Sequence, residues 1–241
     1  MKTFAGDFNF FLDLLKNNIP HAIVRFGDGE LSIIRNKEID ITKKCAGEFK
    51  FLPTDKKDLF LRGLLKESIS FENPMYFKGI VCPCCGNINT FNEMKNYAKT
   101  NLTWANIFVN SNYSLVKRQY IPLLKERKTI LICNKKCESK IKNLPFKPTF
   151  LFFVGTNAWK ENFSLIEKVK KFLKDKQKFV LLSCAGPLSN ILIYSIWKDQ
   201  PNKNILINSG SIFDPWIFGK TRKYHTEGSP NTKKVCIWGE D

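Results

Sequence analysis

Four short runs of apolar and β-branched residues in the second half of the chain limit the fold more than any other feature. They read KTILIC, TFLFFVG, KFVLLSC and KNILINSG, and each ends in a polar or turn-forming group. A helical pattern separates the second run from the third, and another separates the third from the fourth. Strands that are apolar throughout and alternate with helices are typical of a parallel sheet covered on both faces.

The first half of the chain continues this alternation. We expect its elements at residues 7–18 (helix), 21–26 (strand), 54–69 (helix capped by Thr54), 78–82 (strand), 89–108 (helix) and 113–125 (helix, bent or restarted at Pro122). A short helix should also follow the glycine-rich turn after the first strand. The 241 residues contain no internal repeat and no low-complexity linker. The sequence therefore predicts a single Rossmann-like α/β domain over residues 1–241, with a mostly parallel sheet, helices on both faces and a basic tail from about residue 219 to 241.

The net charge of +17 is carried mainly by lysine, because only six of the 39 basic residues are arginine. Surfaces that clamp phosphates and read bases favour the planar fork of arginine. This composition favours general surface charge over nucleic-acid binding. No apolar run approaches the roughly 20 residues of a membrane helix. The N-terminal segment lacks the basic region and cleavage site of a signal peptide, so we expect a cytoplasmic protein.

The cysteines have spacings that allow a structural zinc site. Cys82 and Cys85 form a C-x2-C pair, and Cys133 and Cys137 form a C-x3-C pair. Four thiolates at such spacings suit tetrahedral zinc. The alternative is that Cys133, which ends an apolar run, is buried as a small hydrophobic residue. Without a secretory signal, free thiols or metal ligands are more typical than disulfides.

Two carboxylates stand at the end of the first expected strand, in the stretch RFGDGE. Asp28 and Glu30 offer the oxygen ligands that Mg²⁺ and Mn²⁺ prefer, and Arg25 offers a charge-assisted bond to the phosphates that such a cation shares. The alternative is that Asp28 is an N-cap and Glu30 a first-turn acid that faces the helix dipole. The residue types alone leave both interpretations open.

Polar, glycine-containing loops follow four of the expected strands, at the edge of the sheet where ligands bind in such folds. They are GDGE, GTNAW (with Thr156 and Asn157), SCAGPLSN and NSGSIFDPW. A glycine-rich turn that leads into a helix can bind a phosphate, with Gly186 in the turn and a hydroxyl from Ser183 or Ser189. The alternative for this loop is an ordinary strand-to-helix turn with proline in the first helical position.

The stretch VRFGDGE, followed by a helix, resembles the signature of the glycosyltransferases with the GT-D fold, a family formerly grouped as a domain of unknown function. FVLLSCAGPLSNILIY and NSGSIFD are similar to that family's later strand-loop-helix and to its final strand with an acidic loop. Members bind a divalent metal and a nucleotide-sugar through a D-x-E motif, which falls here on Asp28 and Glu30. The residues that we expect to bind the nucleotide-sugar are Arg25, Gly27, Gly29, Thr156, Asn157, Ser183, Gly186 and Ser189.

The resemblance implies a glycosyltransferase that depends on Mn²⁺ or Mg²⁺ and takes its sugar from a nucleotide-diphosphate sugar, a UDP-sugar by analogy. The expected acceptor is a hydroxyl of a glycan, a glycoprotein, a lipid-linked sugar or a small molecule. Asp214, after the last strand, is the first candidate for the general base, with Glu161 and His225 as further candidates. The alternative for Asp214 is a turn residue before proline. Other candidate functions are another Rossmann-type transferase and a basic nucleic-acid-binding module with a structural zinc, against which the scarcity of arginine counts.

Overall fold

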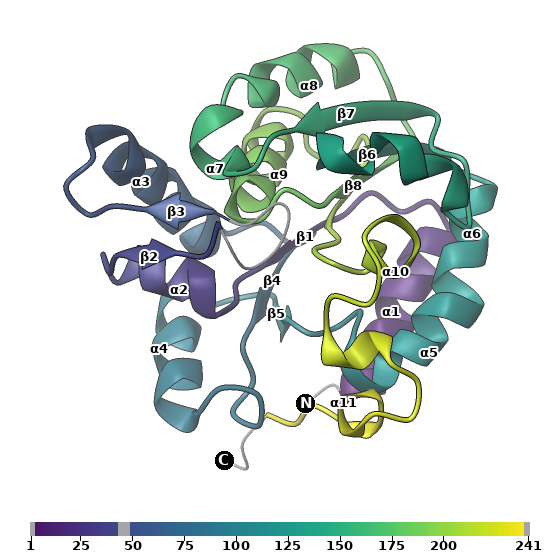
Figure 1. Ribbon diagram of the computed structural model, residues 1–241, viewed down its shortest axis with the longest axis horizontal. Coiled ribbons are helices and arrows are strands. Elements are labelled where there is room, and N and C mark those ends of the chain that lie inside the picture. The colour runs from purple at the N-terminus through teal and green to yellow at the C-terminus, as the bar shows by residue number, and fades with distance from the viewer. Residues whose placement is uncertain (1–2, 43–48, 239–241) are drawn as a thin grey trace.

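A computed structural model describes residues 3–42 and 49–238 of the chain, and in this part seven strands form one parallel sheet (Figure 1). The strand order is β5-β4-β1-β9-β8-β6-β7, and every neighbouring pair is parallel. The strands are β1 (Ala22–Arg25), β4 (Tyr76–Ile80), β5 (Leu102–Trp104), β6 (Lys128–Asn134), β7 (Phe150–Val154), β8 (Phe179–Ser183) and β9 (Ile205–Asn208). A separate antiparallel ribbon joins β2 (Ile39–Asp40) to β3 (Lys50–Phe51). The predicted α/β fold is confirmed.

Helices cover both faces of the sheet, with α7, α8 and α9 on one side and α1, α5 and α6 on the other (Figure 1). None of the helices in the described residues is long and apolar enough to cross a membrane. The helices are α1 (Phe4–Lys16), α2 (Asp28–Ile34), α3 (Lys56–Ser70), α4 (Ile88–Ala98), α5 (Tyr113–Leu115), α6 (Ile121–Lys125), α7 (Ala158–Glu161), α8 (Leu165–Leu173), α9 (Pro187–Asp199), α10 (Asp214–Ile217) and α11 (Pro230–Lys233), with 3-10 turns η1 (Asn110–Asn112), η3 (Lys135–Asn143) and η4 (Lys223–His225) and a π-helical turn η2 (Val116–Tyr120).

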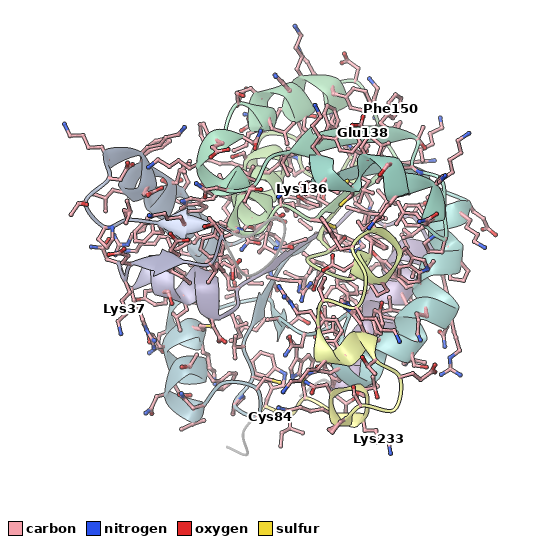
Figure 2. The ribbon with its side chains drawn as sticks, in the orientation of Figure 1. Lys37, Cys84, Lys136, Glu138, Phe150 and Lys233 are labelled. Atoms are coloured by element: carbon pink, nitrogen blue, oxygen red, sulfur yellow. The ribbon has the colours of Figure 1, made fainter. Side chains whose placement is uncertain are left out.

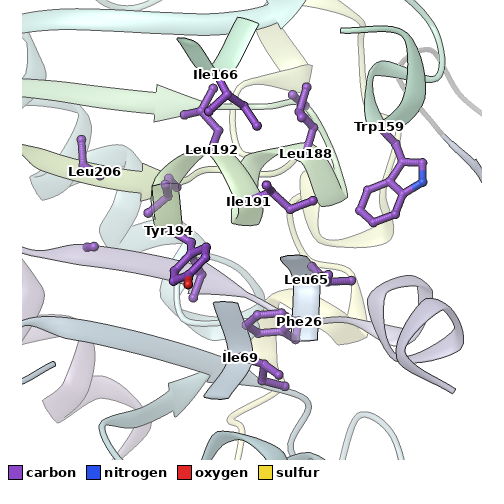
Figure 3. Packing of buried hydrophobic residues seen from close by; sticks show 14 of the residues in the cluster. Phe26, Leu65, Ile69, Trp159, Ile166, Leu188, Ile191, Leu192, Tyr194 and Leu206 are labelled. Atoms are coloured by element: carbon purple, nitrogen blue, oxygen red, sulfur yellow. The ribbon is translucent and has the colours of Figure 1, made fainter. Parts of the chain in front are cut away.

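Apolar side chains alternate between the two faces of the sheet along each central strand. Val24 belongs to the buried cluster beneath α3 and α9, whereas its neighbour Ile23 belongs to the cluster beneath α1. Figure 3 shows part of the first cluster, to which α3 contributes Leu65 and Ile69 and α9 contributes Ile191. Because both faces are buried, each strand reads as a continuous apolar run in the sequence.

The helix predicted over residues 89–108 is too long, because it ends at Ala98. Lys99 and Asn101 have φ angles of 53° and 51°, which break the helical path. The next residues, Leu102–Trp104, form β5 and pair in parallel with β4. The local pattern is helical, but the pairing partner decides the structure of this segment.

The N-cap predicted at Thr54 is one residue early. Asp55 caps α3, and its side chain accepts hydrogen bonds from the backbone N–H groups of Lys57 and Asp58 at 2.9 and 3.0 Å. The helix predicted over 113–125 forms, and it changes register before Pro122. Proline lacks an N–H and its ring crowds the carbonyl four residues earlier, so the preceding turn widens into the π-helical η2.

Lysine side chains project from many parts of the surface, as Figure 2 shows for Lys37 after α2, Lys136 in η3 and Lys233 at the end of α11. The basic tail, by contrast, is partly packed rather than fully solvated. His225 and Cys236 in this tail are buried, and Arg222 lines a cavity described below. The positive charge is spread over the molecule, as expected for general surface charge.

Candidate active site

A cavity of about 340 Å³ lies at the carboxyl-end edge of the sheet, where residues at or after the ends of six strands converge. Half of the sheet runs outward from β1 through β4 to β5, and the other half ends at β9 beside β1. Such a switch in strand order opens a crevice above the sheet in α/β folds. The cavity is lined by Arg25, Gly27, Asp28, Glu30, Val81, Cys85, Ala105, Asn106, Cys133, Asn134, Cys184, Gly186, Asn208, Gly210, Ser211, Asp214, Ile217, Phe218 and Arg222.

The two carboxylates of the GDGE turn both line this cavity. Gly27 is the N-cap of α2, and the Glu30 carboxylate accepts a hydrogen bond from its backbone N–H at 2.9 Å. Asp28 is the first residue of the helix rather than its N-cap. A Cβ at Gly29 would lie 2.8 Å from the ring of Phe49, so a side chain there would have to displace that ring. The turn therefore brings two acids to one site.

Arg25 lines the same cavity as these acids, and two backbone carbonyls hold its side chain. Its guanidinium donates to the carbonyl oxygens of Ala105 and Ser209, the latter at 3.1 Å. Burial lowers the pKa of Arg25, although the nearby Tyr224 and Glu30 act in the opposite direction. Gly210 adopts a φ of +55°, and a Cβ there would lie 2.8 Å from the Arg25 Nη1 atom. Arg25 therefore ties the loops after β5 and β9 together at the cavity.

The loop between β8 and α9 brings Gly186 to the cavity and keeps the two predicted serines out of it. Ser183 and Ser189 are fully buried, and their hydroxyl oxygens lie 2.8 Å apart in a mutual hydrogen bond. Ser189 also accepts from the Ala185 N–H at 3.0 Å. Gly186 has a φ of 56°, which favours glycine, and Pro187 begins α9. The serines hold the turn, whereas the backbone near Gly186 is what borders the cavity.

The loop after β7 lies apart from the cavity, because β7 is the edge strand of the sheet. Neither Thr156 nor Asn157 is among the lining residues. Asn157 is in the left-handed conformation at φ 61°, and its side chain accepts from the Lys50 N–H at 3.0 Å. Glu161, in the following helix α7, does not line the cavity either. Asn157 thus links the start of α7 to β3.

Asp214 begins α10 and lines the same cavity as Asp28 and Glu30. Its carboxylate accepts from the Thr221 hydroxyl at 2.5 Å. Its own carbonyl accepts from the N–H groups of Phe218 and Gly219, so it shapes the turn as well. Both sequence interpretations of Asp214 are thus compatible with its position.

His225 is held in the neutral form by two hydrogen bonds. Its Nδ1 accepts from the Arg222 N–H at 3.1 Å, which leaves Nε2 to donate to the Ser211 carbonyl at 3.0 Å. Because both ring nitrogens are occupied, the geometry argues against His225 as the general base.

Burial lowers the pKa of both histidines, His21 and His225, from 6.5 to about 4. In the unfolded chain the histidines take up protons near pH 6.5, whereas in the folded protein they do so only near pH 4. The free energy of unfolding therefore falls as the pH drops from about 6.5 toward 4, and it is unaffected by these groups above pH 6.5. For the fully buried His21 the loss should reach about 3 kcal/mol. We expect neither imidazole C–H signal to shift in NMR spectra between about pH 8 and pH 5.5. A midpoint near the ordinary value for either histidine would contradict its burial.

Three asparagines lie at this edge to which the sequence analysis assigned no role. Asn190, within α9, donates to the Arg25 carbonyl at 2.8 Å and accepts from the Arg25 N–H at 3.1 Å. Its side-chain oxygen also accepts from the Asn208 amide at 2.7 Å. Asn190 therefore occupies the gap where β1 and β9 separate. Asn190 is the last residue of the quoted loop SCAGPLSN and Asn208 is the first of NSGSIFDPW, but the sequence does not show that the two side chains meet.

Asn134, at the end of β6, is the third of these residues. It is buried and lines the cavity. Its side-chain oxygen accepts from the Lys136 N–H at 2.9 Å, whereas its Nδ2 has no hydrogen-bond partner among the residues that the structure describes. A buried donor without a partner is costly, and a ligand oxygen in the cavity would satisfy it.

The four cysteines of the predicted zinc site are not brought together. Cys82 and Cys85 follow β4, whereas Cys133 lies within β6. The strands β4 and β6 are four positions apart in the sheet, or about 19 Å. Cys133 is buried, as its alternative interpretation predicted. Cys82 and Cys85 instead lie with Cys84 and Cys236, and Cys45 lies outside the described residues.

Solved structures of other proteins share this fold. No protein-family model matches the sequence, and neither does any curated protein. One similar structure is described as a new glycosyltransferase (DUF1792) from Streptococcus sanguinis; it is 15% identical, with a TM-score of 0.56, and the match covers 97% of this chain and 93% of that chain. Another, reported under the statement that the highly conserved domain of unknown function 1792 has a distinct glycosyltransferase fold, is 16% identical, with a TM-score of 0.53 and coverage of 95% and 88%. At such identities the match establishes the shared fold, which agrees with the resemblance found in the sequence.

Proposed function

We propose that this chain is a glycosyltransferase that binds a nucleotide-diphosphate sugar in the cavity above β1 and β9. The observation that carries the proposal is the position of Asp28 and Glu30. Both carboxylates line a cavity at the switch in strand order, in a fold shared with proteins described as glycosyltransferases. Ligand sites in open α/β sheets form at such positions.

The residues at the GDGE turn fit a divalent cation. Asp28 and Glu30 supply carboxylate oxygens, the ligand type that Mg²⁺ and Mn²⁺ take. A carboxylate has about four lone-pair sites, so the bond from the Gly27 N–H does not prevent Glu30 from also binding a cation. When bound, such a cation would neutralise charge on a diphosphate leaving group.

The remaining lining residues suit an anionic, oxygen-rich ligand. The N-terminus of α9, a helix of 13 residues, borders the cavity at Gly186 and favours negative charge. Arg222 lines the cavity and is a suitable phosphate contact. The Asn134 amide can donate to a phosphate or sugar oxygen. These groups favour a UDP-sugar or a related donor.

Asp214 is the proposed general base for the acceptor hydroxyl. It lines the same cavity as the two acids of the GDGE turn, and its bond from the Thr221 hydroxyl fixes one carboxylate oxygen. A base on a separate loop can reach an acceptor without displacing the donor, provided that it lies within hydrogen-bond reach of that hydroxyl. The proposed acceptor is a hydroxyl of a glycan, a glycoprotein or a lipid-linked sugar.

Donor binding should be visible as a thermal shift that needs the cation. At a donor concentration about 100 times Kd, binding stabilises the fold by about 2.7 kcal/mol. For a chain of this size that is roughly 5–10 °C in Tm. We expect this shift with a UDP-sugar and Mn²⁺, and a much smaller one with a chelator present or with uridine monophosphate, which lacks the diphosphate. If no nucleotide-sugar shifts Tm with Mn²⁺ present, and no donor is turned over, the proposal is wrong.

A further inference from the structure

A group of four cysteine sulfurs lies beside the cavity and has no part in the proposed reaction. The Sγ atoms of Cys82, Cys84, Cys85 and Cys236 all lie within 4.8 Å of one another. Three of them follow β4 in the stretch CPCCG, and the fourth comes from the C-terminal segment. Figure 2 shows Cys84 at the lower edge of the molecule.

The separations between these sulfurs match a tetrahedral metal centre. Adjacent Sγ atoms are 3.3 Å apart for Cys82 and Cys84, 4.0 Å for Cys84 and Cys85, and 3.8 Å for Cys85 and Cys236. Four thiolates at the usual Zn–S distance of about 2.3 Å would be about 3.8 Å apart. A disulfide needs about 2.05 Å and joins sulfurs in pairs, whereas these four surround one point.

The surroundings of the cluster suit thiolates. The Asn110 Nδ2 donates to the Cys236 sulfur at 3.3 Å and to the Cys85 sulfur at 3.6 Å. The Lys234 ammonium donates to the Cys84 carbonyl at 2.6 Å and brings a positive charge to a site where four thiolates around Zn²⁺ keep a net negative charge. Hydrogen bonds from neighbouring groups to ligand atoms are typical of metal sites.

The backbone on both sides of the cluster is held by contacts of its own. The N–H groups of Cys85 and Gly86 donate to the Cys82 carbonyl at 3.1 and 3.0 Å, which closes the CPCCG turn. In the C-terminal segment, Trp238 packs edge-on against Phe91 and Trp104, with both ring centroids 5.0 Å away. The segment that carries Cys236 is thus packed against α4 and β5, which neighbour the loop after β4.

We propose that Cys82, Cys84, Cys85 and Cys236 bind one Zn²⁺, which joins the C-terminal segment to the wall of the cavity. Four cysteine ligands close the coordination sphere, so the site is structural rather than catalytic. Cys85 lines the cavity, so the metal would hold the β4 loop in the position that the proposed donor site needs. The link to the donor site rests on the proposed function, but the test of the zinc site measures metal content and does not depend on transferase activity.

The test is the metal content of the full chain, purified with a reductant and loaded with Zn²⁺, after dialysis. We expect about one zinc ion per chain. Cys236→Ser should lose the ion, whereas the control Cys137→Ala, at another buried cysteine, should keep it. Replacement of zinc by Co²⁺ in the wild type should give the intense absorption of a tetrahedral four-sulfur site, which does not rely on any variant being folded. The proposal would be overturned by only trace zinc in the wild type or by equal zinc in Cys236→Ser. It would also be overturned by a cobalt spectrum that lacks the absorption of a four-sulfur site.

Discussion

The double variant Asp28→Asn/Glu30→Gln is expected to lose metal-dependent donor binding and to turn over donor at least about 100-fold more slowly. Loss of a group that only supports a metal ligand costs about 10- to 100-fold, so loss of the ligands themselves should reach the upper end of that range. The glutamine side chain in place of Glu30 keeps an oxygen that can accept from the Gly27 N–H. We therefore expect the free energy of unfolding to fall by no more than about 1 kcal/mol.

The control for this variant is a second pair of acids with the same spacing. Glu38 and Asp40 are exposed and do not line the cavity. The variant Glu38→Gln/Asp40→Asn should therefore keep both the Mn²⁺-dependent thermal shift and the turnover of the wild type. If the Asp28/Glu30 variant also kept them, the two acids would serve only to begin α2, and the donor would have to bind without them.

The sheet was predictable from the sequence because its strands are apolar on both faces. Each of β1, β4, β6, β7, β8 and β9 lies within or overlaps a run that the sequence analysis expected to be a strand. The short β5 was not expected, because its residues continue a helical pattern and only its pairing with β4 makes it a strand. A strand of three residues carries too little local signal to compete with the preceding helix.

The site was predictable where a loop at the carboxyl end of a strand forms it, since Gly186 and Asp214 line the cavity together with the acids of the GDGE turn. The acids of the GDGE turn line the cavity because Gly27, Gly29 and the start of α2 lie within a few residues of each other. The partner of Cys85, by contrast, is Cys236, which is 151 residues away in the chain. No spacing rule reaches that far, because the path of the whole chain decides which loops meet. The same holds for Asn190, which is 165 residues from the Arg25 backbone that it binds.

The variant Asn190→Leu is expected to lower the free energy of unfolding by about 3 kcal/mol, although leucine suits the buried helix face. Strands β1 and β9 pair at two positions, Ala22 with Leu206 and Ile23 with Ile207. Beyond that point the strands separate, and the Asn190 amide bonds the N–H and C=O of Arg25 and the amide of Asn208. Leucine would leave these three buried groups without their partner, at a cost of about 1–3 kcal/mol each before the structure relaxes.

The measurement is the free energy of unfolding in urea of Asn190→Leu compared with that of Asn92→Leu. The comparison separates the loss of hydrogen bonds from the change in helix propensity. Asn92 is an exposed residue within α4, so the same change there should alter stability by less than about 0.5 kcal/mol. We also expect Asn190→Leu to weaken donor binding, because the Arg25 backbone and Asn208 both border the cavity. A cost below about 1 kcal/mol would mean that water or a shift of β9 satisfies these groups. In that case the crevice would owe its shape to the divergence of the strands alone, and the amide of Asn190 would not be required to hold it open.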